Sequence, residues 1–281
     1  MGILSGYLIL DYTDEKAALC IKTLADMGAE VIRVNPEEER ERFRDLLKRA
    51  DILIESSPPD YMASRGMGYQ DLDKINPRLI MASITPFGQS GPYKDFKSND
   101  LTIQALGGWL SVTGGPQMPL KLYGNQAYNT ASLFAANGIL LALWHRHVTG
   151  RGQFIDISIM ESVAAALDHV LVRYFYEGIV SGRQGSRHWN NAFDILRCQD
   201  GYVLISIHRQ WETLVEWLAS EGIAEDLTDE KWQDREERNR GIDHIIEVLG
   251  RWTLKHKVGE LVEKGQLMHF PWAEIVAVKN G

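Results

Sequence analysis

The stretch YLILDYTDEKAALCIKTLADMGAEVIRV (residues 7–34) decides the fold class of this 281-residue chain. Its first five residues form an apolar run that predicts a buried strand. Apolar side chains at helical spacing then predict a helix over 15–27, capped by Asp14 and ended by Gly28. Residues 29–34 predict a second strand. A strand, a helix and a strand within 34 residues make a βαβ unit, whose crossover is expected to be right-handed.

The same alternation continues toward the C-terminus. We predict a charged helix over 37–50, a strand over 51–55, a short helix over 69–75 and a strand over 79–85. Apolar strands that alternate with helices predict an α/β protein with a parallel sheet. Ligands of such sheets bind beyond the carboxyl ends of the strands. The expected strand ends are residues 11–14, 34–36, 55–59 and 85–88.

The rest of the chain divides in two. A glycine- and proline-rich loop is predicted over 86–99. Then follow helices over 100–110, 129–148 and 158–177 and a strand over 154–157. A β-hairpin over 193–207 comes next, with helices over 210–220, 228–236, 239–253 and 258–264. We therefore expect a Rossmann-like large domain at 1–191 and a smaller α+β domain at 192–281.

Charge and composition exclude several classes of protein. The chain has 30 Lys and Arg against 38 Asp and Glu, a formal charge of −8, which argues against a nucleic-acid binder. No signal peptide and no apolar stretch long enough for a membrane span are recognised. Cys20 and Cys198 are expected to be reduced and buried, which fits a cytoplasmic protein. His145 and His147 are two residues apart and do not share a helix face, so no metal site is expected.

Two glycine-containing segments suggest anion contacts. The loop ITPFGQSGPY (84–93) follows a strand end, where glycines let backbone N–H groups approach an anion. An ordinary surface loop is the equal alternative. The segment TGRGQ (149–153) lacks the spacing of a phosphate loop and is more typical of a turn. Without a family, the residues indicate an α/β protein with a small-molecule site.

Five segments resemble one family when taken in order: LADMGAEVIRV (24–34), ADILIESSPPDYMASRGMGYQDL (50–72), NPRLIMASITPFGQSGPYKD (76–95), SNDLTIQALGGWLSVTG (98–114) and GILLALWHRHVTGRGQFIDISIMES (138–162). They resemble the family III acyl-CoA transferases, the group of formyl-CoA transferase and carnitine CoA-transferase. The resemblance is clear over about 1–210 and loose beyond.

The resemblance implies a Rossmann-like domain with a small domain, an interlocked dimer, and CoA thioesters bound at the strand ends. Acyl-CoA and a carboxylic acid would be the substrates, with no tightly bound cofactor. In the family's mechanism an Asp carboxylate attacks the thioester, which gives a mixed anhydride and then an enzyme-bound CoA thioester.

The first departure from the family concerns this Asp. Its counterpart here is Tyr128, ten residues before Gly138, and neither Ala127 nor Asn129 is acidic. A phenol cannot form the acyl anhydride. Two-subunit members, such as succinyl-CoA:benzylsuccinate CoA-transferase, have one subunit with the Asp and one without it, and this chain resembles the latter. The expected partner is an Asp-bearing paralogue in a heterodimer or heterotetramer, with a homodimer as the alternative.

The second departure is length. The family has a long insert after the position of Val34, with a basic segment that contacts CoA, and a C-terminal return into the large domain. Here the chain runs almost directly from Asn35 to the helix before residue 50 and stops at Gly281. The resemblance therefore implies an apparently shortened version of the fold and leaves CoA binding open.

The resemblance implies a set of site residues. Candidate CoA-binding residues are Lys16, Ser56, Ser57, Pro59, Arg65, Phe87, Gly88 and Gln89. No catalytic residue is firmly assigned, and the weak candidates are Glu15 and Asp100 beside Tyr128.

Three functions stay open. The first is a non-catalytic subunit of a CoA-transferase. The second is an isomerase or lyase of altered chemistry that uses Lys16, Glu15, Asp100 or Tyr128 as acid or base. The third is a non-enzymatic remnant that acts only as an association partner.

Overall fold

The computed structural model describes residues 2–276, which divide into two compact units. One unit comprises the chain up to Thr113 together with Pro119–Gly182. The other comprises Gly114–Met118 together with the chain from Arg183 onward. The backbone N–H of Gly185 donates to the carbonyl of Gly114 and so ties the excursion 114–118 to the second unit. The expected domain boundary at 191–192 falls after the junction between Gly182 and Arg183. The outermost residues of the two expected domains, 1 and 277–281, lie outside the described range.

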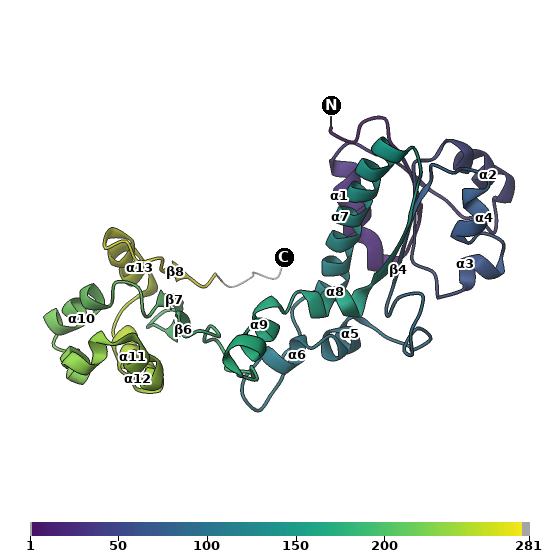
Figure 1. Cartoon of the computed structure of the whole chain (residues 1–281). Coiled ribbons are helices and arrows are strands. Elements are labelled where there is room, and N and C mark those ends of the chain that lie inside the picture. Colours follow the sequence, from purple (N-terminus) through teal and green to yellow (C-terminus); the bar gives the residue numbers. More distant parts are fainter. Residues whose placement is uncertain (1, 277–281) are drawn as a thin grey trace. The chain divides into compact units, whose positions relative to one another are not determined.

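A five-stranded parallel sheet forms the first unit, as the sequence predicted (Figure 1). Its strands are β1 (Leu8–Tyr12), β2 (Glu30–Arg33), β3 (Ile52–Glu55), β4 (Ile80–Thr85) and β5 (Phe154–Ser158). They lie in the order β2-β1-β3-β4-β5, and all neighbours are parallel. The chain leaves β1 toward β2 and then returns to β1's other side to form β3. The topological switch point therefore lies between β1 and β3, where doubly wound sheets bind ligands.

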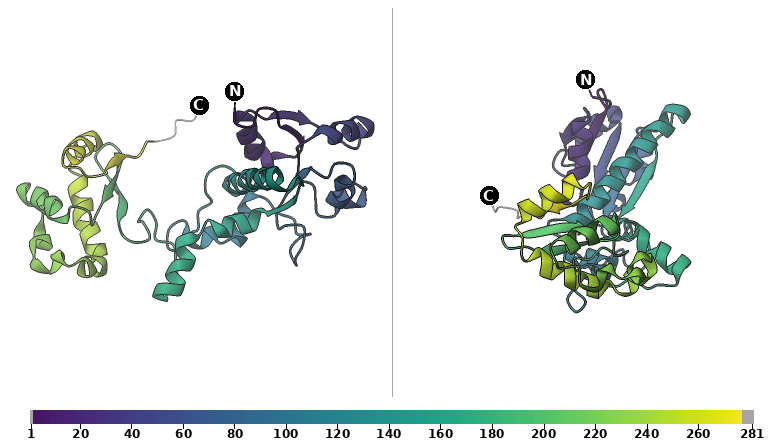
Figure 2. Two further views of the ribbon diagram at one scale, coloured as in Figure 1. Left: turned by 45° about the horizontal axis from the view of Figure 1, so that its top comes forward. Right: turned by 90° about the vertical axis from the view of Figure 1, so that its left-hand side faces the viewer.

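The two faces of the sheet pack against different helices. Alternate strand residues such as Ile9, Ile52 and Ile54 face α1 (Ala18–Asp26) and α7 (Gln126–Thr149), which contact each other (Figure 2). Their neighbours Leu10 and Leu53 face α2 (Arg40–Arg49) and α4 (Tyr69–Asp73). Because side chains alternate across a strand, an unbroken apolar run can fill both cores. This explains why the strands read as continuous apolar segments.

Several predicted helices are divided. The segment 15–27 forms a 3₁₀ turn, Glu15–Ala17, before α1, and Asp14 caps it as expected. The helix predicted over 100–110 is α5 (Asp100–Leu106) followed by α6 (Trp109–Val112), because Gly108 takes a left-handed conformation with φ 95°. The helix predicted over 158–177 is α8 (Ile159–Ala165) followed by α9 (Asp168–Glu177). A short helix α3 (Tyr61–Ser64) is additional.

The second unit joins a small antiparallel sheet to a helical layer. The predicted hairpin is present as β6 (Phe193–Arg197) and β7 (Tyr202–Ser206), and β8 (Ala273–Glu274) extends it. The helices are α10 (Trp211–Ser220), α11 (Arg235–Arg240), α12 (Ile242–Thr253) and α13 (Val258–Leu267). The helix predicted over 228–236 was wrong, because Glu225–Thr228 and Glu230–Gln233 are separate 3₁₀ turns before α11. Extended backbone at Asp229 and Asp234 separates these turns.

Candidate functional site

A cleft of about 1040 Å³ opens at the carboxyl ends of β1 and β3. It is lined by the loop that follows β1, by the start of the β3–α3 connection, and by residues from three further segments. Among the residues that were candidates from the sequence, Glu15, Lys16, Ser56, Ser57, Pro59 and Tyr128 line it. The cleft therefore lies at the switch point of the sheet, where the fold predicts a ligand.

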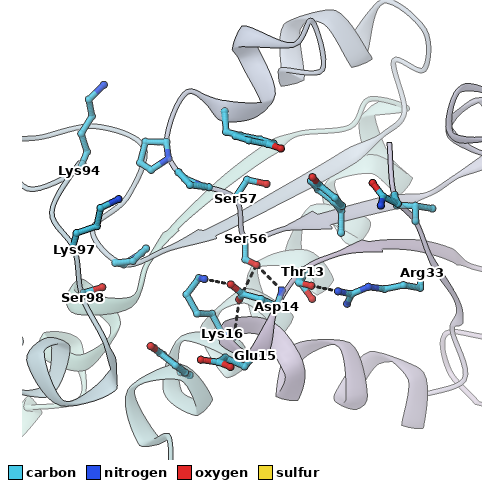
Figure 3. A pocket seen from close by; sticks show the side chains of 18 of the residues that line it. Thr13, Asp14, Glu15, Lys16, Arg33, Ser56, Ser57, Lys94, Lys97 and Ser98 are labelled. Atoms are coloured by element: carbon cyan, nitrogen blue, oxygen red, sulfur yellow. Dashed lines mark hydrogen bonds and ion pairs between the residues drawn. The ribbon is translucent and has the colours of Figure 1, made fainter. Parts of the chain in front are cut away.

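A hydrogen-bonded network joins the two strand ends in this cleft (Figure 3). The Ser56 hydroxyl donates to Asp14 Oδ1 at 3.0 Å and accepts from the Asp14 backbone N–H at 2.8 Å. The Lys16 ammonium donates to the other Asp14 oxygen. Burial opposes the charge of Asp14, but the bonds from Lys16 and Ser56 outweigh it, so the pKa of Asp14 is lowered. The network holds Lys16 in place while its side chain stays 18% exposed.

Tyr128 enters the cleft from the first turn of α7 and is only 7% exposed. One turn later on the same helix, the Ser132 hydroxyl donates to the carbonyl of Lys16 at 3.2 Å. The helix and the loop after β1 are thus joined next to the phenol. Burial raises the pKa of Tyr128, and the charges of Glu15 and Asp100 raise it further. The phenol is therefore neutral at physiological pH and can donate a hydrogen bond.

Asp100 has a different place from the other candidates. It is 5% exposed and does not line the cleft. Its carboxylate accepts from the backbone N–H of Ala127 at 2.9 Å and from Gln104 at 2.6 Å, and pairs with Lys121 at 3.1 Å. It thereby caps the N-terminus of α7 from outside that helix. This geometry gives Asp100 the role of fixing the residue before Tyr128.

Arg65 lies outside the lining of the cleft. Its guanidinium stacks over the ring of Tyr61 at 3.6 Å and pairs with Glu37 at 2.9 Å, and the Tyr61 hydroxyl also donates to Glu37. Because Tyr61 itself lines the cleft, Arg65 supports the cleft's aromatic wall.

The segment 87–89 is also held away from the cleft. Phe87 is buried, and Gly88 has φ 84°. Gln89 donates its backbone N–H to Asp156 at 2.9 Å and its amide to Ser83 at 2.8 Å. Gln89 lines a second, smaller cavity of about 300 Å³. The structure therefore does not bring these three residues together with Lys16 and Tyr128.

Four basic residues of the cleft were not predicted from the sequence: Arg33, Arg42, Lys94 and Lys97. Arg33 ends β2, and Arg42 lies in the first turn of α2. Lys94 and Lys97 come from the loop before α5. Arg33 sits at a predicted strand end, so position alone could have found it. The other three depend on how helix and loop pack in space.

Chemically, the cleft combines a neutral phenol and a held ammonium group with charged side chains of both signs, five basic and five acidic in all. The phenol and the ammonium can donate hydrogen bonds to the oxygens of an acyl or carboxylate group. Among residues 2–276, no cluster of three or more His, Cys, Asp or Glu side chains is placed to hold a metal ion. Within the same residues, no helix is long and apolar enough to span a membrane.

Comparison with known proteins gives consistent matches. The chain matches the model of CoA-transferase family III over residues 35–280. Succinyl-CoA:(R)-benzylsuccinate CoA-transferase subunit BbsE of Thauera aromatica is 35% identical over 240 residues, which are 82% of this chain and 58% of that protein. Succinyl-CoA–L-malate CoA-transferase beta subunit of Chloroflexus aurantiacus is 38% identical over 150 residues, 53% of this chain and 37% of that protein. The chain thus spans about half the length of these relatives.

A solved structure agrees with the fold. The structure of a CaiB/BaiF family protein from Brucella suis has a TM-score of 0.86 and 26% identity, and the match covers 98% of this chain and 84% of that one. It supports the α/β architecture of both units as the structure has them. The family model spans far more than half of the sequence. As the five motifs indicated, the chain therefore belongs to CoA-transferase family III.

Proposed function

We propose that this chain is a subunit of an enzyme that transfers CoA between an acyl-CoA and a carboxylic acid, and that it does not itself supply the nucleophile. The observation that carries the proposal is Tyr128. By the resemblance of the surrounding motif it stands where the family has its Asp, and it lines the cleft at the sheet's switch point. A neutral phenol there can bind an acyl oxygen but cannot form the mixed anhydride. An Asp-bearing paralogous subunit would supply the carboxylate.

The cleft itself supports a ligand-binding role in this subunit. Its volume of about 1040 Å³ lies at the upper end for small-molecule sites. Lys16 is fixed by Asp14, so an ammonium group is presented to the acyl end of a ligand. Both features suit an acyl-CoA.

A reconstitution assay tests the proposal. The chain is purified alone and together with an Asp-bearing paralogue, and CoA transfer from succinyl-CoA to a panel of carboxylic acids is measured. We expect activity only in the mixture. Tyr128→Phe should leave that activity largely intact, whereas replacing the paralogue's Asp should abolish it. Transfer by this chain alone would overturn the proposal.

One observation favours a second candidate, an acyl-CoA isomerase or lyase. Glu15, Lys16 and Tyr128 line the same cleft, so an acid and a base are available near one ligand. This function predicts turnover of an acyl-CoA without any carboxylic acid acceptor, and loss of that turnover in Tyr128→Phe. Mass spectrometry of acyl-CoA incubated with the chain alone distinguishes the two candidates.

A further inference from the structure

We propose that the second unit binds a small carboxylate at Arg238, beside Trp211 and His208. Arg238 lies in α11, Trp211 begins α10, and His208 precedes Trp211 by three residues. All three belong to the second unit, so the inference does not rest on the function proposed for the cleft. Each of these side chains has a buried nitrogen atom without a hydrogen-bond partner among the described residues. Buried nitrogens left in this state indicate an occupant, which is either water or an anion.

Arg238 is a buried cation without a counter-ion. It is 7% exposed, and among residues 2–276 it forms no ion pair. Its guanidinium carbon lies 5.2 Å from the ring centroid of Trp211, which offsets part of the charge. Burial and the charge of Arg235 lower the pKa of Arg238, and the charge of Asp234 opposes them only in part. Because buried charges in proteins are normally paired, an anion is favoured over water here.

The guanidinium of Arg238 has one edge free for a ligand. Nη1 donates to the backbone carbonyls of Trp232 at 2.6 Å and of Gln233 at 2.9 Å. Nε is buried without a partner, and Nη2 makes no hydrogen bond within the described chain. The hydrogens of Nε and Nη2 point in the same direction, and their spacing matches the two oxygens of a carboxylate. A carboxylate can therefore bind this edge in the bidentate arrangement.

Trp211 supplies a third donor next to this edge. It is 4% exposed, and its indole Nε1 can only donate a hydrogen bond. The free edge and the indole together present three N–H groups. A water molecule has two lone pairs and no charge, whereas a carboxylate has about four acceptor positions and a full negative charge. The set of donors therefore favours a carboxylate as the occupant.

The site lies just beneath the surface of α11. Arg235 is one helical turn before Arg238 and is exposed, and so is Asn239. Solvated side chains of this kind change rotamer readily, so a small carboxylate such as formate can reach the buried edge.

His208 connects the site to pH. Its Nε2 lies 2.9 Å from the side-chain oxygen of Asn239, which can only accept, so Nε2 carries the hydrogen and Nδ1 of the neutral ring carries a lone pair. Burial lowers the pKa of His208, and the charges of Arg238 and Arg235 lower it further, against the bond from Asn239. The ring is therefore neutral without a ligand. A bound carboxylate favours the protonated ring, so binding and proton uptake strengthen each other.

NMR on the full chain with isotope-labelled tryptophan tests the proposal, with formate as the probe. The indole signal of Trp211 is assigned by its loss in Trp211→Phe. We expect formate, but not chloride at the same ionic strength, to shift this signal in a saturable way, with tighter binding at about pH 6 than at about pH 8. Arg238→Lys keeps the charge but loses the two-donor edge and should weaken formate binding about tenfold. Arg240→Lys, on the exposed side of α11, is the matched control and should bind as the unaltered chain does.

Other results overturn the proposal. No saturable shift with formate would show that the site holds only water, and an equal response to chloride would show that it does not recognise a carboxylate. Unchanged formate affinity in folded Arg238→Lys would also refute it. His208→Gln keeps Arg238 in place and decides the question if Arg238→Lys does not fold. In His208→Gln the pH dependence of formate binding should disappear, and its persistence would contradict the placement of the ligand beside His208.

Discussion

Replacing Asp100 tests whether this residue holds α7 in place or takes part in acid–base chemistry. The Asp100→Ala change removes the acceptor of the Ala127 N–H, of the Gln104 amide and of the Lys121 ammonium at a site that is 5% exposed. Each buried group left without a partner costs roughly 1–3 kcal/mol. The Lys121 ammonium that loses its partner is 35% exposed and can be solvated, so the Ala127 N–H and the Gln104 amide set the cost, and we take about 3 kcal/mol for the whole change.

The loss should be local to the start of α7. Because the chain has two units, a single unfolding transition would not report it cleanly. Hydrogen exchange of residues 126–135 measures the opening of these turns directly. A loss of about 3 kcal/mol corresponds to a protection more than a hundredfold lower, since 1.4 kcal/mol is a factor of ten.

Two further variants sharpen this test. Asp100→Asn keeps one oxygen for the Ala127 N–H and should cost only about 1–2 kcal/mol. Asp26→Ala removes an exposed ion pair with Lys22 and should change stability by less than about 0.5 kcal/mol. Protection of residues 126–135 within threefold of the unaltered chain in Asp100→Ala would refute the capping role. Loss of catalysis in Asp100→Asn with protection unchanged would instead indicate a chemical role.

Three other perturbations follow from the contacts. Arg146→Met removes a charged donor from the Arg78 carbonyl and from the carbonyl and carboxylate of Asp51 at a 4% exposed site. The N–H groups of Ile80 and Leu8 still donate to Asp51, so urea unfolding of the first unit should show a loss of roughly 1–3 kcal/mol, and a loss under about 0.5 kcal/mol would contradict this. Gly152→Ala would put a Cβ into the carbonyl of Leu79 and should lower the melting temperature. Gly182→Ala, which has open space around it, should leave the melting temperature unchanged. Equal melting temperatures of the two variants would argue against the close approach of Gly152 to Leu79. Burial opposes the charge of Glu221, but hydrogen bonds from Trp252, Trp217 and His256 outweigh it and lower the pKa of this carboxyl group. The stability that these bonds give is therefore complete above about pH 4.5. It is lost as the pH falls through the lowered pKa. Thermal melts between pH 3 and 7 should show a smaller acid loss in Glu221→Gln, and identical profiles would count against the linkage.

The sheet was readable from the sequence because its signal is local. Strands buried on both faces appear as short apolar runs, and each run here is followed by a polar turn or a helix pattern. The order of the strands was not readable in the same way. The βαβ rule predicts parallel neighbours and a handedness, but the return from β2 to the far side of β1 is decided by how α1, α7 and α2 share the two faces.

Two of the three divided helices show which breaks a local sequence signal can predict. The break between α5 and α6 falls at Gly107 and Gly108, and a glycine pair is a signal that a closer reading could use. A side chain at Gly107 would also meet Val163 of α8. The break between α8 and α9 falls at Ala166 and Leu167, which carry no such signal. Leu167 packs against the core of the first unit, so tertiary contact decides that break.

The candidate site shows the same difference between residues placed by local sequence patterns and residues placed by tertiary contacts. Residues that directly follow strands, such as Lys16, Ser56 and Ser57, come together because the carboxyl ends of parallel strands share one edge. Arg65 and Gln89 do not join them, because Arg65 pairs with Glu37 and Gln89 donates to Asp156, contacts between distant parts of the sequence. No local rule relates Lys97 to this edge, since it comes from the loop before α5, in which Phe87, Tyr93 and Phe96 pack against one another.

The fold and the chemistry of the site are therefore determined by different parts of the chain. The switch point, the network of Asp14, Lys16 and Ser56, and the cap at Asp100 fix where the first turn of α7 meets the cleft. None of these contacts depends on which side chain stands at 128. The scaffold can thus keep its cleft with a phenol at this position. If an Asp-bearing partner supplies the nucleophile, as we propose, this chain would still bind the ligand, which is why binding and transfer must be measured separately.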